Sequence, residues 1–409
     1  MIYQTFDLVR RSLNPITLML EAGHELARHE KNPWRDTLLH RAFGAACEVP
    51  ARALRAYPKQ EFMVRDGRGG FLEERCVQSL PFADLVGFGV KNAAGKPKVL
   101  VAAALSGHHA TLLRDTLRGF ARNFDPYISD WKDARMVPPE EGDFGFDDYV
   151  DYLITFLETL GPGTHVVATC QAAPPALVAA AVLAERNLQL VPASLTLMAG
   201  PIDTRVNKTL INKVSDRLPL DLLKKTNIMT VPAGYPGSGR RVYPGLFQLS
   251  GFVAMNLLVH VRKYGEFISH SIGGNHEDAE TFREFYDEYF SVLDMTESFY
   301  VETLEKVFYE HHIPTGLMTF RGKPVDFGAL RAMPLLTVEG SEDQFCSLGQ
   351  TEAAHAICPN IPEDMRRHHV QAGVGHYGIF SGSKFQKHIY PVIRDFIHTS
   401  VEQRKQAAA

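Results

Sequence analysis

Cys170, Asp343 and His376 are the residues of this chain whose types and order could support covalent catalysis. A thiol becomes a strong nucleophile when a base takes its proton, and the base works best when an acid orients it. The chain supplies the thiol first, then the acid, then the imidazole. This set predicts attack of a thiolate on an acyl carbon, with a thioester as the covalent intermediate.

Cys170 stands at the junction between a predicted strand and a predicted helix. Residues 165–169 form a short apolar run rich in β-branched side chains, and the alanine-rich stretch after Gln171 favours a helix, with Pro174 and Pro175 in its first turn. A residue on such a sharp turn is lifted clear of both elements, and the helix N-terminus beneath it favours a thiolate. The alternative is a buried structural cysteine before an ordinary core helix.

The acid and the base lie in loops that are placed by strand-like and helix-like sequence. Asp343 comes shortly after the predicted strand 333–338, and His376 lies in a glycine-rich loop ahead of the last predicted helix. Glu339 and Glu342 are rival acids a few residues away, and His376 is one of 17 histidines. The joint occurrence of acid and base at these positions favours a triad over unrelated loop residues.

An acyl-transfer site also needs two backbone N–H groups that face the developing oxyanion. Gln171, the residue after the nucleophile, supplies one, and His108 is the predicted second because it follows the predicted strand 97–105. A metal site at His108 and His109 is not expected, because adjacent side chains rarely converge on one ion. The candidate substrate-binding residues are Ser106, Gly107, His109 and Tyr377.

Strand-like and helix-like segments alternate from about residue 75, which is the pattern of a mostly parallel, doubly wound α/β sheet. The alternation stops after residue 201, gives way to a helical and aromatic block, and returns with the strand at 333–338. Together with the order of the triad, this predicts an α/β-hydrolase fold with a helical cap inserted over the sheet. The expected divisions are an N-terminal helical segment at 1–74, a first part of the core at 75–202, the cap at 203–325 and a second part of the core at 326–409.

The composition narrows the class of protein. The chain has 409 residues, a net charge of −4 and a pI near 6.5, which argues against a general nucleic-acid-binding protein. Its five cysteines show neither metal-like pairing nor a disulfide framework, so a reducing cytoplasm is expected. The N-terminus lacks a secretory-signal pattern, and polar residues interrupt the most apolar window, 242–261, so no membrane span is expected. No cofactor is predicted, and the sequence does not indicate an oligomeric state.

Several separated blocks carry a family resemblance. They are 105–115 (LSGHHATLLRD), 127–135 (YISDWKDAR), 147–149 (DDY), 169–171 (TCQ), 200–203 (GPID), 243–245 (YPG), 285–289 (FYDEY), 339–340 (EG), 349–351 (GQT) and 373–378 (GVGHYG). Across most of the chain from about residue 80, these blocks resemble the intracellular polyhydroxybutyrate depolymerases. The resemblance implies a cytoplasmic cysteine hydrolase, related to polyhydroxyalkanoate synthases, that acts on amorphous poly(3-hydroxybutyrate) as oligomers or at the surface of storage granules. Its triad falls on Cys170, Asp343 and His376.

The chain departs from the family pattern at two places. Ala172 and Ala173 separate Gln171 from Pro174, where the family usually has proline directly after glutamine, and Gln344 follows Asp343 where a second aspartate is usual. The triad is unaffected, but these changes leave the preferred chain length of the polymer open.

Other functions fit the same residues. An acyltransferase of the polymer-synthase type would form the same thioester and pass the acyl group to coenzyme A. A catalytically inactive protein of this fold could instead bind granules. Within the cap, the apolar stretch 241–260 and the aromatic residues between 285 and 300 could line a groove for polymer or form the cap's own core.

Overall fold

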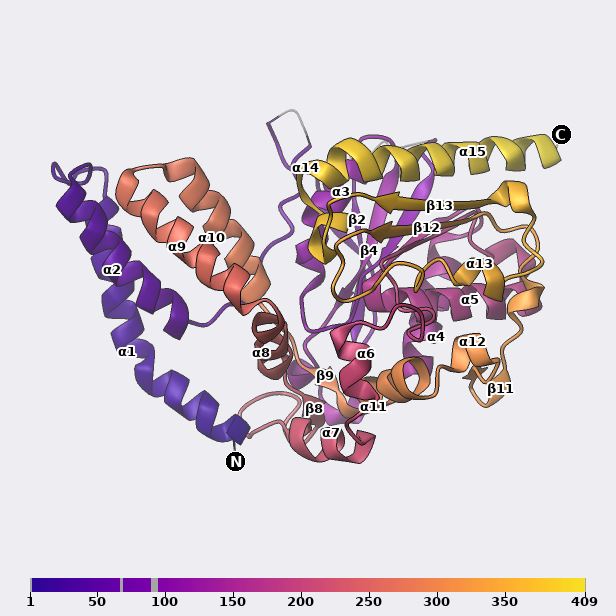
Figure 1. Cartoon of the computed structure of the whole chain (residues 1–409), viewed down its shortest axis with the longest axis horizontal. Helices are drawn as coiled ribbons and strands as arrows, with labels where there is room; N and C mark the ends of the chain where they lie inside the picture. Colours follow the sequence, from indigo (N-terminus) through magenta and orange to yellow (C-terminus); the bar gives the residue numbers. More distant parts are fainter. Residues whose placement is uncertain (1, 67–68, 90–94, 409) are drawn as a thin grey trace.

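The computed structural model describes residues 2–66, 69–89 and 95–408. An eight-stranded sheet forms its centre (Figure 1). All neighbouring pairs in the sheet are parallel except the two at its N-terminal edge, which are antiparallel. In order across the sheet, the strands are β1 (Glu74–Ser79), β2 (Ala83–Phe88), β4 (Asp125–Trp131), β3 (Lys98–Ala102), β5 (His165–Thr169), β6 (Leu195–Met198), β12 (Leu335–Gly340) and β13 (Arg366–Gln371).

The central strands are short apolar runs that are buried on both faces, as expected for parallel strands covered by helices. α4 (Phe146–Leu160) and α5 (Ala173–Arg186) pack together on one face, and α3 (Arg114–Ala121) and α15 (Tyr390–Ala408) cover the other (Figure 1). The strand and helix around Cys170 are therefore the predicted ones, and the predicted mostly parallel sheet with helices on both faces is confirmed. The core also contains α13 (Ala354–Ile357), α14 (Gly382–Lys384) and the π-helix η10 (Phe385–Ile389). Its short 3-10 helices are η1 (Ala110–Leu113), η2 (Ala134–Met136), η3 (Pro139–Glu141), η4 (Cys170–Ala172), η5 (Leu188–Leu190), η7 (Phe327–Ala329), η8 (Glu363–Met365) and η9 (His376–Ile379).

A group of helices stands beside the sheet (Figure 1). It combines the N-terminal hairpin with helices from the middle of the chain, which are far apart in sequence but lie side by side. We call these five helices the helical lobe: α1 (Ile2–Arg28), α2 (Leu38–Leu54), α8 (Gly245–Met255), α9 (Leu257–Gly273) and α10 (His276–Phe290). Among the residues that the structure describes, no helix is long and apolar enough to cross a membrane.

The block between β6 and β12 is less uniformly helical than the sequence suggested. A three-stranded sheet, β7-β8-β9, joins its parts, and its strands of two or three residues are too short to give a periodic hydrophobic signal. The remaining elements are β7 (Met229–Thr230), β8 (Arg241–Tyr243), β9 (Met295–Thr296), β10 (Thr319–Phe320), β11 (Lys323–Pro324), α6 (Leu210–Ser215), α7 (Leu220–Asn227), α11 (Glu297–Thr303), the π-helix η6 (Leu304–Tyr309) and α12 (His312–Thr315).

Candidate active site

Cys170 lies at the end of β5, where the chain turns through η4 into α5. Its φ is +50°, a left-handed conformation that strains a non-glycine residue and is typical of functional sites. Gly200, after β6, makes the close packing possible. A Cβ at Gly200 would lie 2.1 Å from the Cβ of Ala173 and 3.1 Å from the carbonyl oxygen of Cys170. The turn therefore has the geometry of a nucleophile elbow, with glycine on the neighbouring strand end in place of the usual flanking glycine.

Asp343 and His376 meet beside this turn. The Nδ1 atom of His376 is 2.7 Å from Oδ2 of Asp343, and the Asp343 side chain is fully buried. The other carboxylate oxygen accepts hydrogen bonds from the backbone N–H groups of Phe345, at 2.8 Å, and Cys346, at 3.0 Å. The acid is thereby held in one orientation, which in turn holds the imidazole ring.

The charges around His376 favour its protonated form. Burial lowers the pKa of His376, but the Asp343 carboxylate and then Cys170, which also hydrogen bonds to the ring, outweigh it and raise the pKa to about 10. At neutral pH the ring is therefore an imidazolium next to the sulfur of Cys170. A cysteine beside a positive imidazole and at a helix N-terminus is in the environment that makes thiols reactive.

The two rival acids are arranged differently. Glu339 is buried, and its carboxylate accepts three backbone N–H bonds, from Gly349 at 2.8 Å, Thr351 at 2.7 Å and Glu352 at 3.1 Å. These hydrogen bonds hold the loop after β12 in place. Glu342 lines the larger cleft described below. Asp343 is the acid whose carboxylate bonds to His376.

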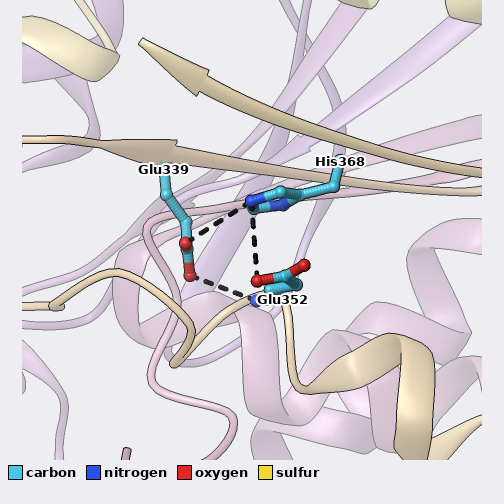
Figure 2. Close-up of side chains that lie close together, drawn as sticks. All are labelled: Glu339, Glu352 and His368. Atoms are coloured by element: carbon cyan, nitrogen blue, oxygen red, sulfur yellow. Dashed lines mark hydrogen bonds and ion pairs between the residues drawn. The ribbon is translucent and has the colours of Figure 1, made fainter. Parts of the chain in front are cut away.

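Glu339 also belongs to the one group of side chains, within the described part of the chain, that lies close enough to share a metal ion. Figure 2 shows it with Glu352 and His368, and their ligand atoms lie within 4.8 Å of one another. Because the Glu339 oxygens already bind three backbone donors and Nδ1 of His368 is 2.8 Å from Oγ1 of Thr337, the cluster is fully explained as a structural network.

A cavity of about 180 Å³ adjoins the sulfur of Cys170. Most of its walls are apolar, and both Cys170 and His376 line it. Gly107 is not among its lining residues, because its Cα packs against α8: a Cβ there would lie 2.7 Å from Oε1 of Gln248. The other predicted residues that line the cavity are Ser106, His108, His109, Gln171 and Tyr377.

The two backbone N–H groups expected to stabilise an oxyanion are available. His108 forms an isolated bridge with Val292, but the hydrogen bond there runs from Leu293 N–H to the carbonyl oxygen of Gly107. Neither His108 N–H nor Gln171 N–H has a hydrogen-bond acceptor among the described residues. Unpaired backbone donors are rare in buried positions, so their presence beside a nucleophile is informative.

The rings of His108 and His109 are neutral. Burial lowers the pKa of His108 to about 4 and that of His109 to about 3. The His108 ring stacks on Phe252 of α8, with ring centres 5.4 Å apart, and contacts Tyr289 and Tyr377. It is therefore part of an aromatic wall between the cavity and the helical lobe.

A larger cleft of about 640 Å³ lies between this wall and helices α9 and α10. Phe345, His376 and Tyr377 line both spaces, and Phe252, which packs edge-on against Phe345 at 5.5 Å, lines only the inner one. The cleft is rich in aromatic rings: Phe267, Phe282, Phe285, Tyr286 and Tyr289. A still larger space, of about 1030 Å³, opens between the lobe and the core, but Cys170 and His376 do not line it.

Among the cavity residues that were not predicted from the sequence, two lie in the acid loop. Cys346 lines the same cavity as Cys170, and burial raises the pKa of its thiol well above the ordinary value. Phe345 forms the border between cavity and cleft. They lie two and three residues after Asp343, so the acid loop itself was the only available signal.

The strand order, the turn after β5 and the contact of Asp343 with His376 define the α/β-hydrolase fold class. Within it, residues 199–401, just under half of the chain, match the model of a protein family described as PHB de-polymerase C-terminus. Asp343 and His376 lie inside the matched region, and Cys170 precedes it. The fold and this match support an ester hydrolase.

Solved structures with a similar arrangement include three bacterial proteins. A putative lipase from Acinetobacter baumannii AYE has 13% identity and a TM-score of 0.45, covering 80% of this chain and 93% of its own. A putative aryl esterase from Burkholderia cenocepacia has 12% identity and a TM-score of 0.44, covering 81% and 100%. A hydrolase from Pseudomonas aeruginosa PA01 has 14% identity and a TM-score of 0.46, covering 80% and 98%. Similarity at this level does not assign an activity, and the comparison with curated proteins gives no match.

Proposed function

We propose that this chain hydrolyses ester bonds of amorphous poly(3-hydroxybutyrate) to 3-hydroxybutyrate or its oligomers, through a thioester on Cys170. The observation that carries the proposal is the contact of Asp343 with His376 beside Cys170, in a small apolar cavity next to an aromatic cleft. The family match supplies the substrate class. Such a substrate would place the enzyme in the cytoplasm, at storage granules.

In the first half of the reaction, the Cys170 thiolate attacks the ester carbonyl. The negative charge that develops on the carbonyl oxygen is held by the N–H groups of Gln171 and His108, and losing one such donor typically costs about 10²–10³ in rate. His376, protonated at neutral pH, gives its proton to the departing alkoxide. The alcohol end of the chain leaves, and the acyl group remains on the sulfur.

In the second half of the reaction, Cys170 no longer carries the negative charge that favoured the protonated form of His376. A thioester sulfur is neutral, so the contribution of Cys170 to the raised pKa of His376 is lost while the lowering by burial remains. The ring, which gave up its proton to the leaving alkoxide, is now neutral and takes a proton from the attacking water. Collapse of the tetrahedral intermediate releases the hydroxy acid and restores the thiolate and imidazolium.

The two connected spaces suggest how polymer reaches Cys170. The cavity has room for a short acyl segment, and the aromatic cleft offers an apolar path for the rest of the chain. Phe252, one of the apolar cap residues singled out in the sequence, stands at the border. We propose that Phe252 and the cleft aromatics contact the polymer, within a cap proposed to span residues 203–325.

The test is release of 3-hydroxybutyrate from artificial amorphous granules by wild type, Cys170→Ala and Phe252→Asp. Wild type should release acid, Cys170→Ala should release none, and Phe252→Asp should lose about 10-fold or more on granules but much less on a short p-nitrophenyl ester. Added coenzyme A identifies the acceptor: formation of an acyl-coenzyme A with no free acid would assign a transferase. Granule binding without any product from wild type would contradict the proposed activity.

A further inference from the structure

The outer side of the α1–α2 hairpin is an exposed apolar surface that the proposed reaction does not use. Its seven large side chains are between 46% and 77% exposed. On α2 its members recur every three or four residues, and on α1 their spacings of one, three and seven residues also keep them on one side of the helix. We call this set the outer hairpin face: Leu8, Val9, Ile16, Met19 and Leu26 on α1, with Leu39, Phe43, Ala46, Pro50 and Ala53 on α2.

The two stripes lie next to each other and form one surface. A Cβ at Gly23 of α1 would lie 3.8 Å from the ring of Phe43 and 3.0 Å from the sulfur of Cys47, so α2 packs closely there. Phe43 therefore lies over α1 at the centre of the face. Its neighbours on both helices are aliphatic or small.

The rest of the hairpin surface has a different character. On α1, Glu21 and Glu25 line the large charged space between the lobe and the core. On α2, Glu48 pairs with Arg283 of α10, with N–O distances of 2.6 and 2.8 Å. The side of α2 that carries Glu48 is thus covered by the lobe, in which α2 lies beside α9 (Figure 1). The large side chains of the outer hairpin face are exposed instead.

We propose that the outer hairpin face is the contact between two copies of this chain. No charged residue occurs at its positions, so it can face an identical surface without placing like charges together, as a two-fold interface requires. The exposed fractions correspond to an apolar area on the order of 700 Å² per copy, close to the roughly 800 Å² per partner of a standard stable interface. Isolated monomers rarely expose a contiguous apolar patch of this size.

The charge pattern argues against an anionic lipid surface as the occupant. Helices that lie on such surfaces carry many lysines and arginines beside the apolar side. Around the face, α1 instead offers acids and bases together, among them Glu21, Glu25 and Arg28, and it contains no lysine. Pairing through the hairpins would also leave the aromatic cleft open, because α9 and α10 lie between that cleft and α2.

The experiment measures mass by light scattering and sedimentation from about 1 to 100 µM, the range in which interfaces of this size usually associate. Wild type should have twice the 45.6 kDa chain mass. Met19→Glu and Leu39→Glu each place a charge in the contact on both copies and should weaken association by at least about 100-fold, giving the monomer mass. The matched control is Leu188→Glu, an equally drastic change at a side chain that is 72% exposed on η5, and it should stay dimeric.

Circular dichroism melting of each variant shows whether it folds, and activity on a short ester should be unchanged in all of them. A monomeric wild type at 100 µM, or a dimer that both substitutions leave intact, would overturn the proposal. So would a monomer that binds phosphatidylcholine vesicles or polymer granules and loses this binding in Met19→Glu, because the face would then serve a non-protein surface.

Discussion

The sheet edge around Cys170 and the helical lobe are held in place by different forces. At the sheet edge, buried apolar strands and two close backbone approaches fix the site: a Cβ at Gly200 would meet Ala173, and one at Gly340 would lie 2.5 Å from the carbonyl oxygen of Val374. The lobe has a much smaller apolar cluster and is joined by buried ion pairs such as Glu48 with Arg283. The proposed catalytic residues therefore lie on the tightly packed sheet edge. The lobe, which borders the aromatic cleft, is held in place by ion pairs.

The largest effect is expected from substitution of Cys170, the proposed nucleophile. Cys170→Ala should reduce turnover of any ester substrate by about 10⁵-fold or more, as removal of a triad nucleophile does elsewhere. The melting temperature should not fall, because the substitution removes only the sulfur atom and leaves the packing around the strained turn unchanged. Residual activity within 100-fold of wild type would place the chemistry elsewhere.

A second test compares two acids, Glu339 at the end of β12 and Asp343 in the loop that follows. Asp343→Asn should cut the rate by about 10⁴, because the amide cannot stabilise the imidazolium. Glu339→Gln removes at least one acceptor from three buried backbone donors and should cost about 1–3 kcal/mol of stability while the folded protein keeps its rate. Kinetic measurements and thermal melts of both variants test these roles. If Glu339→Gln lost the rate and Asp343→Asn lost only stability, the two roles would be exchanged.

The pair of cysteines in the cavity gives a third test. The pKa of His376 is raised to about 10, so the imidazolium beside Cys170 persists from neutral pH up to that value. Iodoacetamide at pH 7 should therefore label Cys170 quickly in the wild type. In the His376→Ala variant it should label Cys170 about 10- to 100-fold more slowly. Cys346, whose pKa is raised by burial, should remain unlabelled in the folded protein, which peptide mass spectrometry can verify.

In the lobe, Glu48→Gln leaves the buried guanidinium of Arg283 with only Glu280, at 3.0 Å, as an anionic partner. Breaking a buried pair costs about 3–5 kcal/mol, and we expect the loss to appear as local opening of the lobe. Hydrogen exchange in α2 and α10 should increase, whereas the rate on a short ester should stay within about twofold. A matched loss of short-ester activity would show that the lobe also positions the site.

The smallest effect is expected at the junction of lobe and core, where Asp133 and Asp294 are buried together. Burial, with the Asp294 charge, raises the pKa of Asp133 from 3.8 to about 7. Because the folded pKa is raised, this stabilising contribution is complete below pH 3.8 and is lost as pH rises through about 7. Asp294→Asn should therefore flatten the fall in melting temperature between pH 5 and 8 by a few degrees, and a parallel curve would refute the coupling.

The sequence predicted the sheet edge far better than the lobe. Residues 165–169 carry a strong apolar pattern, and they form β5 with the expected bounds. The meeting of Asp343 with His376 followed from strand-end positions, because parallel strands end at one edge. The packing of α1 and α2 on α9 and α10 could not be predicted, since buried arginine and glutamate partners leave no hydrophobic period. The polar strand β13, residues 366–371, was missed for the same reason.

The position of β13 at one edge of the sheet affects how the protein behaves at high concentration. An open sheet has two edges whose free backbone groups can pair with other chains and start aggregation. One edge is β13, which contains Arg366, Arg367 and two histidines, and the other is β1, which begins with Glu74 and Arg75. Both terminal strands expose charged or polar side chains: Arg367 and His368 on β13, and Glu74, Arg75 and Ser79 on β1. The polar sequence of β13 is the reason that no hydrophobic pattern predicted it. The same polar side chains disfavour edge-to-edge pairing of neighbouring molecules.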